Sequence, residues 1–488
     1  MIAQRRAVTL FLLAGLLTPS SLHAQGYAGE VRVRADFFEL RGLVRDSLPE
    51  GSVAGDGLTR QLADGTGVTC LPGDYCRWYR ASTPRTVSPT YGDLRFAAWP
   101  GVEGLSVHTQ IRTRFLSDDL WPRSGQEIDV ISAYARFDWR GWRASGGRLL
   151  RTSGLGYHNF DGAAVLWKGL SPLRLEAWGG WSLYPGTNAP RNGTLLAESD
   201  VFAPDKRALL YGFEAGLDLD RTFSLRGMYQ REIRTDRLAL YSERIAADAR
   251  LLLRQVVIDG SLAYDLAYKQ VNSARVAAGI PLPAGLHLTL EGRHYTPFFE
   301  LWTIWGAFSP VGYAEGRGML QWTLPGTGVQ LEAGGGYRDY ETANGGVSFV
   351  PIKEDGWRLY GGGRWQGQRW FVDGGYRSET GFGASRYGGD LTVGRTFGRD
   401  IRIAAHGTVT QTFGEFRLGE QVATGGGLDL AWNLGDLTLA GSAGLYRMTY
   451  DNRPDSPDWT QGRAHVSLAY RFGSTASPRT SMRGIGGY

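Results

Sequence analysis

Several features of soluble globular proteins are scarce in this chain of 488 residues. Beyond the N-terminal segment, no stretch approaches the roughly 20 apolar residues that a membrane-spanning helix requires, and helical periodicity is hard to find. The formal net charge is +5, and the arginines are spread along the chain without a basic run. A nucleic-acid partner is therefore not expected. Any residence in a membrane must use strands.

Motifs that carry chemistry are also absent. The 7 histidines are scattered, and neither HExxH nor CxxCH occurs. A Ser-His-Asp set assembled from distant strands stays open, but nothing local in the sequence supports one. We therefore expect a protein that is not an enzyme, with no catalytic residue, no bound metal and no cofactor.

The N-terminus indicates export. Arg5 and Arg6 precede an apolar run over residues 7–17, and small and polar residues then lead to Ala24. This pattern is typical of a secretory signal peptide, here residues 1–24. The chain has only 2 cysteines, Cys70 and Cys76, which enclose a Pro-Gly-Asp turn. In an exported chain without a second cysteine pair, a local disulfide is favoured over a metal site.

Glycine, aromatic residues and alternation are abundant. The chain has 70 glycines, and 12% of its residues are aromatic. Apolar and polar residues alternate over residues 105–115, 131–139, 286–293 and 401–409, which is the period of a strand with one apolar face. Segments of this kind number about 22 over residues 25–473. The weakest lie at residues 91–99 and 274–280, so 18 or 20 strands stay open.

The connections between these segments alternate in length. Tight turns such as "WRGW", "PGTG" and "NLGD" alternate with longer polar connections such as residues 185–206 and 341–355. Short turns on one side and long loops on the other are typical of outer-membrane barrels. We expect an all-β fold: one antiparallel up-and-down barrel over residues 25–473, without a plug domain. A long extracellular loop at 46–89 and a C-terminal tail at 474–488 complete it.

This fold predicts a place in the outer membrane of a Gram-negative cell, with both termini in the periplasm. Outer-membrane lipid and the barrel-assembly machinery are then its expected partners, with a periplasmic or cell-surface protein as a further one. Aromatic residues beside the tight turns, on the apolar parity of their strands, predict a periplasmic girdle. The girdle tryptophans are Trp139, Trp142, Trp167, Trp365, Trp370 and Trp432.

One stretch, "GGRLLRTSGLGYHNFDGAAVLW", resembles bacterial porins and alginate-export-type barrels. These often carry a "GR" strand, a loop and a "DG" strand, matched here by Gly147-Arg148 and Asp161-Gly162. The resemblance implies a channel whose arginine projects into the lumen. The glutamine that often follows this arginine is Leu149 here.

Polar residues on the other parity predict the pore lining. With Arg148 from the resemblance, the set is Arg112, Arg114, Arg136, Arg148, Glu291, Arg293, Glu315, Arg317, Arg364, Asp373 and Arg402. Pairs of opposite charges along the wall of a water-filled lumen account for most of these residues. A field across the pore that mildly favours anions is the functional hypothesis.

Two loops stand out as candidates to narrow the barrel or to dock a partner. Residues 297–312 are strongly apolar for an extracellular loop, with Phe298, Phe299, Trp302, Trp305 and Phe308. Longer flanking strands, whose aromatic residues form an outer girdle, explain these apolar side chains equally well. The segment at 46–89, stapled by the cysteines, is the candidate internal plug.

Two functions remain. In the first, the protein is a porin-like channel for small hydrophilic solutes. In the second, the barrel is a component of an export assembly for polysaccharide secretion or of a porin-cytochrome conduit.

Overall fold

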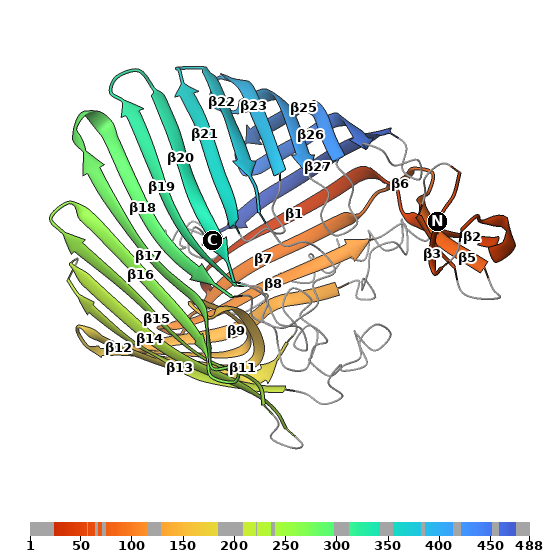
Figure 1. Cartoon of the computed structure of the whole chain (residues 1–488). Coiled ribbons are helices and arrows are strands. Elements are labelled where there is room, and N and C mark those ends of the chain that lie inside the picture. Colours follow the sequence, from red (N-terminus) through yellow and green to blue (C-terminus); the bar gives the residue numbers. More distant parts are fainter. Residues whose placement is uncertain are drawn as a thin grey trace, which may run out of the picture.

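A closed antiparallel β-barrel forms the body of the computed structural model (Figure 1). The structure describes residues 24–55, 57–63, 67–70, 75–115, 128–183, 208–220, 222–235, 240–296, 312–341, 355–381, 386–412, 421–450 and 458–474. The main sheet has 23 strands, of which the short β6 (Arg85–Val87) only adds to the end of β1; the other 22 close the wall. The predicted fold class and strand number are confirmed.

The wall strands follow one another in chain order. The first half comprises β1 (Ala24–Leu40), β7 (Thr90–Pro100), β8 (Leu105–Phe115), β9 (Ile128–Trp139), β10 (Trp142–Ser153), β11 (Gly156–Leu170), β12 (Leu173–Ser182), β13 (Ala208–Leu219), β14 (Phe223–Arg234), β15 (Leu240–Leu253) and β16 (Val256–Asp265). The second half comprises β17 (Gln270–Leu282), β18 (Leu286–Tyr295), β19 (Tyr313–Leu324), β20 (Val329–Tyr340), β21 (Asp355–Gln366), β22 (Trp370–Glu379), β23 (Arg386–Phe397), β24 (Ile401–Thr412), β25 (Gln421–Leu434), β26 (Leu437–Tyr450) and β27 (Trp459–Gly473). The two segments with the weakest alternation, 91–99 and 274–280, lie in β7 and β17.

The barrel closes where its first and last strands meet. Val31 of β1 is paired with Tyr470 of β27 on one side and with Leu94 of β7 on the other. The start of β1 and the end of β27 therefore lie at the same end of the barrel as the tight turns. Two short 3-10 helices, η1 (Glu50–Ser52) and η2 (Pro283–Gly285), interrupt the strands. No helix of the described residues is long and apolar enough to cross a membrane.

The two faces of the wall differ in chemistry. On one parity, large apolar side chains such as Leu428 and Leu445 are exposed, Leu445 to 67%. On the other parity, arginines and carboxylates form ion pairs, including pairs between strands two apart, such as Arg358 of β21 with Glu315 of β19. Side chains converge only on the concave side of a curved sheet, so the charged face is the inner one. The apolar outer face matches the surface of a barrel in a bilayer.

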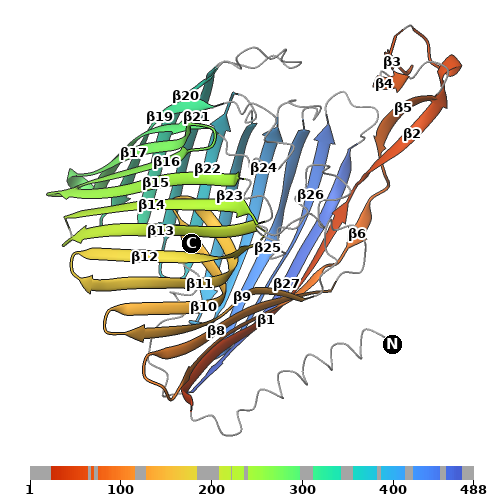
Figure 2. The ribbon, with the colours of Figure 1, turned by 90° about the horizontal axis from the view of Figure 1, so that it is seen from below.

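A second, four-stranded sheet lies between β1 and β7 in the chain. It consists of β2 (Leu43–Pro49), β5 (Tyr75–Ala81), β4 (Gly67–Cys70) and β3 (Thr59–Gln61), in that order. A disulfide joins Cys70 to Cys76 across β4 and β5. Both views place this sheet beyond the ends of the wall strands, on the side away from the tight turns (Figure 2). The candidate internal plug is therefore not inside the barrel: the sheet lies beyond the wall strands and forms its own small core.

Some predicted segments lie outside the described residues. These are residues 1–23 of the signal peptide, residues 475–488 of the tail and residues 297–311 with Phe298, Phe299, Trp302, Trp305 and Phe308.

Candidate pore and constriction

Ten of the predicted pore-lining residues share the inner face of the wall. They are Arg112, Arg114, Arg136, Glu291, Arg293, Glu315, Arg317, Arg364, Asp373 and Arg402. Most of them are ion-paired; Arg112, for example, lies 2.7 Å from Asp93 of the neighbouring strand. Arg402 instead stacks on the ring of Phe371 at 4.0 Å. Their part in conduction stays a prediction.

Several carboxylates of this face lie beneath arginines. Glu291 of β18 receives Arg275 of β17 at 2.8 Å and Arg317 of β19 at 2.9 Å. The Glu291 side chain is only 4% exposed, whereas the two arginines are 40% and 41% exposed. The two guanidinium groups therefore present more surface to the lumen than the acid that they neutralise.

The same arrangement recurs around the barrel. Glu315 is almost fully buried between Arg338 at 3.3 Å and Arg358 at 3.2 Å. On β1, Arg34 is half exposed while its partner Asp36, 2.7 Å away, is mostly covered. At these three clusters a solute in the lumen meets guanidinium groups first and carboxylates second, whereas Asp373 and Asp138 are about as exposed as their arginines.

Arg148 does not line the pore, which corrects the expectation from the porin resemblance. It is paired with Ala133 of β9, and it shares its parity with the exposed Trp142 and Leu150, so it belongs to the outer face. Its guanidinium holds Asp161 with two hydrogen bonds of 2.7 and 2.9 Å, and donates a third of 3.1 Å to the Val130 carbonyl. These bonds satisfy a charge that would be costly next to lipid.

Arg148 marks the point where a hairpin leaves the wall. Pairing of β10 with β9 ends at Arg148, and pairing of β11 with β12 begins only at Phe160. Between these points, β10 and β11 are paired only with each other, through Ser153 and Gly156. We call residues 149–159 the inner hairpin. Figure 1 shows the gold ribbon curling inward beside the β9 label.

Three glycines permit this bend. Gly147, Gly162 and Gly180 lie side by side on the inner face of β10, β11 and β12. Gly147 has a φ of 129°, in the region that favours glycine. A Cβ on Gly162 would overlap the Gly179 carbonyl oxygen and lie 2.6 Å from the Gly180 Cα. The strands approach too closely here for any other residue.

The tip of the inner hairpin reaches past β12 and β13 and packs on the inner face of the next three strands, β14 to β16. Leu155 is buried against Met228, Ala246 and Ala263, which belong to β14, β15 and β16 and face inward. A ring nitrogen of His158 lies 3.1 Å from the Gln230 amide. The hairpin therefore covers the inner wall and narrows the lumen.

Arg151 fixes the base of the hairpin. Its guanidinium binds Glu176 of β12 and, at 2.6 Å, Glu214 of β13. It also lies 3.7 Å from the ring centroid of Trp178. Glu176 and Glu214 are direct cross-strand partners, so a cation is needed to hold the two carboxylates together. Beside them, Leu149, Phe160, Trp178 and Leu210 form a buried apolar cluster.

The sequence reasoning missed this constriction. The sequence did contain a signal for it. Counting every second residue from Trp142 along the apolar face of the strand reaches Arg148 and then Leu150. That parity puts the arginine outside and leaves Leu149 and Arg151 inside, on a strand that ends in a turn of two residues.

The predicted girdle residues lie at the tight-turn end of the barrel. Trp139 and Trp142 flank one turn and are direct partners, and Trp167 is paired with Trp142. Trp365 and Trp370 flank another turn, and Trp432 lies on the outer face two residues from the end of β25. All except Trp167 are strongly exposed. Contact with lipid headgroups stays a prediction.

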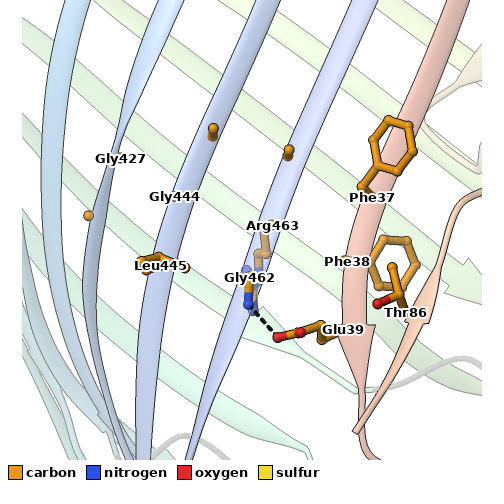
Figure 3. A pocket seen from close by; sticks show the side chains of 12 residues that line it. Phe37, Phe38, Glu39, Thr86, Gly427, Gly444, Leu445, Gly462 and Arg463 are labelled. Atoms are coloured by element: carbon orange, nitrogen blue, oxygen red, sulfur yellow. Dashed lines mark hydrogen bonds between the residues drawn. The ribbon is translucent and has the colours of Figure 1, made fainter.

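A hollow of about 560 Å³ lies over the barrel seam, between β1 and β25–β27 (Figure 3). Glycines of β25 and β26 leave it open, and Phe37 and Leu445 flank it. The Glu39 carboxylate accepts a hydrogen bond of 2.8 Å from the Gly462 amide, where β1 turns from β27 to β6. The hollow therefore follows from barrel closure, and nothing in it points to a solute.

No protein-family description and no curated protein matches the chain. Among solved structures, Pseudomonas aeruginosa OccK8 (OprE) is similar at 9% identity over 92% of this chain and 98% of that one, with a TM-score of 0.39. Acinetobacter baumannii OccAB4 shows 9% identity, 93% and 100% coverage and a TM-score of 0.39. A bacterial polysaccharide outer membrane secretin shows 10% identity, 62% and 97% coverage and a TM-score of 0.31. Similarity at this level carries no information on solute or partner.

Proposed function

We propose that this protein is an outer-membrane channel for small hydrophilic solutes, with a mild preference for anions. In this proposal, the tight turns and both termini face the periplasm, and the long connections face outward. The barrel spans the bilayer with its apolar outer face, and solutes pass along the charged inner face.

The observation that carries the proposal is the burial of carboxylates beneath exposed arginines. Around Glu291, Glu315 and Asp36, the acid is covered while at least one arginine head remains accessible. The charges of each cluster nearly cancel, so the field is weak. Its sign at the exposed surface of these clusters is positive, which favours small anions.

The inner hairpin is the constriction in this proposal. Its Arg151 is held by Glu176 and Glu214, and its tip is anchored by Leu155. A narrowed lumen limits the size of the solutes and brings them close to the charged wall.

Single-channel recording in a planar bilayer tests the proposal. The purified mature protein is expected to give stable conductance steps, and a tenfold KCl gradient is expected to give a small reversal potential of the sign for chloride. A reversal potential of the opposite sign would contradict the anion preference. A protein that stays closed would contradict the open channel and favour a barrel that works inside an export assembly or a cytochrome conduit.

A further inference from the structure

A second group of polar side chains lies on the lumen wall beside the barrel seam. Ser442 of β26 and Arg463 and His465 of β27 share the inner face, because His465 is paired with Ser442 on one side and with Asp36 of β1 on the other. In the strand order of the closed wall, β26 lies halfway round the barrel from β15, on which the tip of the inner hairpin packs. The hairpin therefore does not cover this group.

Arg463 is an exposed cation that forms no ion pair within the described part of the chain. Its Nε donates a hydrogen bond of 2.6 Å to Gln461, and its guanidinium lies 4.8 Å from the ring centroid of Tyr446. The Tyr446 ring lies over Gly425 and Gly444, where a side chain would collide with it. These contacts hold the guanidinium against the wall and leave both of its Nη groups for a ligand.

The protonation state of His465 decides what Ser442 can donate. Nδ1 of His465 and Oγ of Ser442 are 2.7 Å apart. A protonated imidazole carries a hydrogen on both ring nitrogens, so Nδ1 then donates to the Ser442 oxygen and the hydroxyl hydrogen points elsewhere. A neutral ring with no hydrogen on Nδ1 instead accepts the hydroxyl hydrogen. Protonation therefore adds a cation and ensures a free hydroxyl donor at the same place.

The carboxylates around His465 each have a partner of their own. Asp36, the direct partner of His465 on β1, is bound by Arg34 at 2.7 Å. Asp429 of β25 lies 2.8 Å from a ring nitrogen of His406. The opposite charge of Asp36 stabilises the protonated imidazole across the strands. In acid, the group itself then holds two positive charges, and in alkali it holds one.

We propose that Ser442, Arg463 and His465 form a binding site for a doubly charged oxyanion of the sulfate type, which assembles when His465 is protonated. Arg463 and His465 are two residues apart on one strand, so their side chains leave the backbone about 7 Å apart. This spacing lets both cations reach one tetrahedral anion through charge-assisted hydrogen bonds, with the Ser442 hydroxyl as a third donor. The inference rests on the proposed function, because the anion reaches this wall through the lumen.

The same side chains fit other chemistry less well. Ser442, His465 and Asp36 have the composition of a nucleophilic set. The backbone amides beside Ser442, however, are bonded in the ladders to β25 and β27. No pair of free N–H groups is then available in these strands to stabilise the intermediate of a hydrolysis. Among the residues that the structure describes, no group of three or more histidine, cysteine or carboxylate side chains could hold a metal ion either.

Isothermal titration calorimetry with sodium sulfate tests this inference on the full-length protein in detergent, at pH 5 and pH 8. Sulfate keeps its double charge over this interval, whereas histidine is the side chain that changes charge within it. We expect sulfate to bind about tenfold more tightly at pH 5, which is the gain from one charge-assisted contact. Equal affinity at the two pH values, or no binding at pH 5, would overturn the inference.

Substitutions separate this site from the general charge of the lumen. His465→Gln is expected to lower the affinity at pH 5 about tenfold, to its value at pH 8. Ser442→Ala removes one neutral hydrogen bond and is expected to lower the affinity about threefold at pH 5. His287→Gln is the matched control, because His287 faces the lumen on the distant β18, and it should leave the affinity within about twofold. Equal losses in His287→Gln and His465→Gln would overturn the site.

Conductance separates a failure of this inference from a failure of the channel. Single-channel steps in KCl at pH 8 are expected in the unsubstituted protein and in all three variants. A protein that conducts but binds sulfate equally at both pH values would overturn the site and leave the channel intact. A protein that binds sulfate in acid but never conducts would support the site and contradict the channel.

Discussion

At the scale of single residues, the face on which a charge lies decides its role. Arg148 and Arg317 both sit in alternating strands and both bind one carboxylate closely. Arg148 points outward, where hydrogen bonds to Asp161 and to the Val130 carbonyl satisfy its charge, and Arg317 points into the lumen with its head exposed. The sequence motif alone did not distinguish these cases, because a Gly-Arg pair looks the same on either parity.

The arginines around Glu291 provide a direct test of selectivity. Arg275→Gln combined with Arg317→Gln removes two exposed cations and leaves the Glu291 carboxylate facing the lumen without a partner. We expect the reversal potential in a KCl gradient to shift toward cations. Arg447→Gln is the control, since Arg447 is exposed on the outer face at the far end of β26 and, among the described residues, forms its ion pair with Asp458. An equal shift in both variants would contradict a role for the inner cluster.

Arg151 is expected to control the constriction. Arg151→Met leaves Glu176 and Glu214 opposite each other, and among the described residues Arg174 alone then pairs with them, at 3.0 and 3.7 Å. Loss of one partner from a buried pair costs about 3 kcal/mol, which is enough to change the docked fraction of the hairpin strongly. We expect a larger and noisier conductance in single-channel recordings. Arg151→Lys keeps the charge but lacks the forked guanidinium, so its conductance should fall between those of the unsubstituted protein and the Met variant. An unchanged conductance in the Met variant would show that the hairpin does not need Arg151 as an anchor.

At the scale of elements, the strands could be predicted and the inner hairpin could not. Period-two alternation is local, so the segments at 105–115 and 401–409 correspond to β8 and β24. The inner hairpin depends instead on where ladders stop, since β10 is paired with β9 only as far as Ala133, and β11 is paired with β12 only from Ser182 onward. That information lies in neighbouring strands. The register of the disulfide-linked sheet likewise makes it a separate unit, whereas its length alone suggested a plug.

The bend of the inner hairpin rests on glycines that a substitution can test. Gly162→Ala places a methyl group against the backbone of Gly179 and Gly180, which must move apart. We expect a loss of about 1–3 kcal/mol, typical of overpacking, seen as a lower urea midpoint for the folded band on gels. Gly146→Ala, in the adjacent pair of the β10–β11 ladder, meets nothing within 4 Å and should be neutral. Equal midpoints for both variants would rule out close approach as the reason for Gly162.

At the scale of the whole molecule, the apolar outer face and the charged inner face together require a bilayer. Leu428 lies halfway along β25 and is exposed on the outer face, and Leu434 is exposed on the same face at the tight-turn end of that strand. If the bilayer surrounds the barrel, Leu428→Arg costs about 2–4 kcal/mol because it places a charge near the membrane midplane, and Leu434→Arg costs about 0–1 kcal/mol near the interface. Urea unfolding in lipid vesicles measures both. Similar costs at the two depths would mean that this face does not lie in hydrocarbon, and the channel proposal would fall with it.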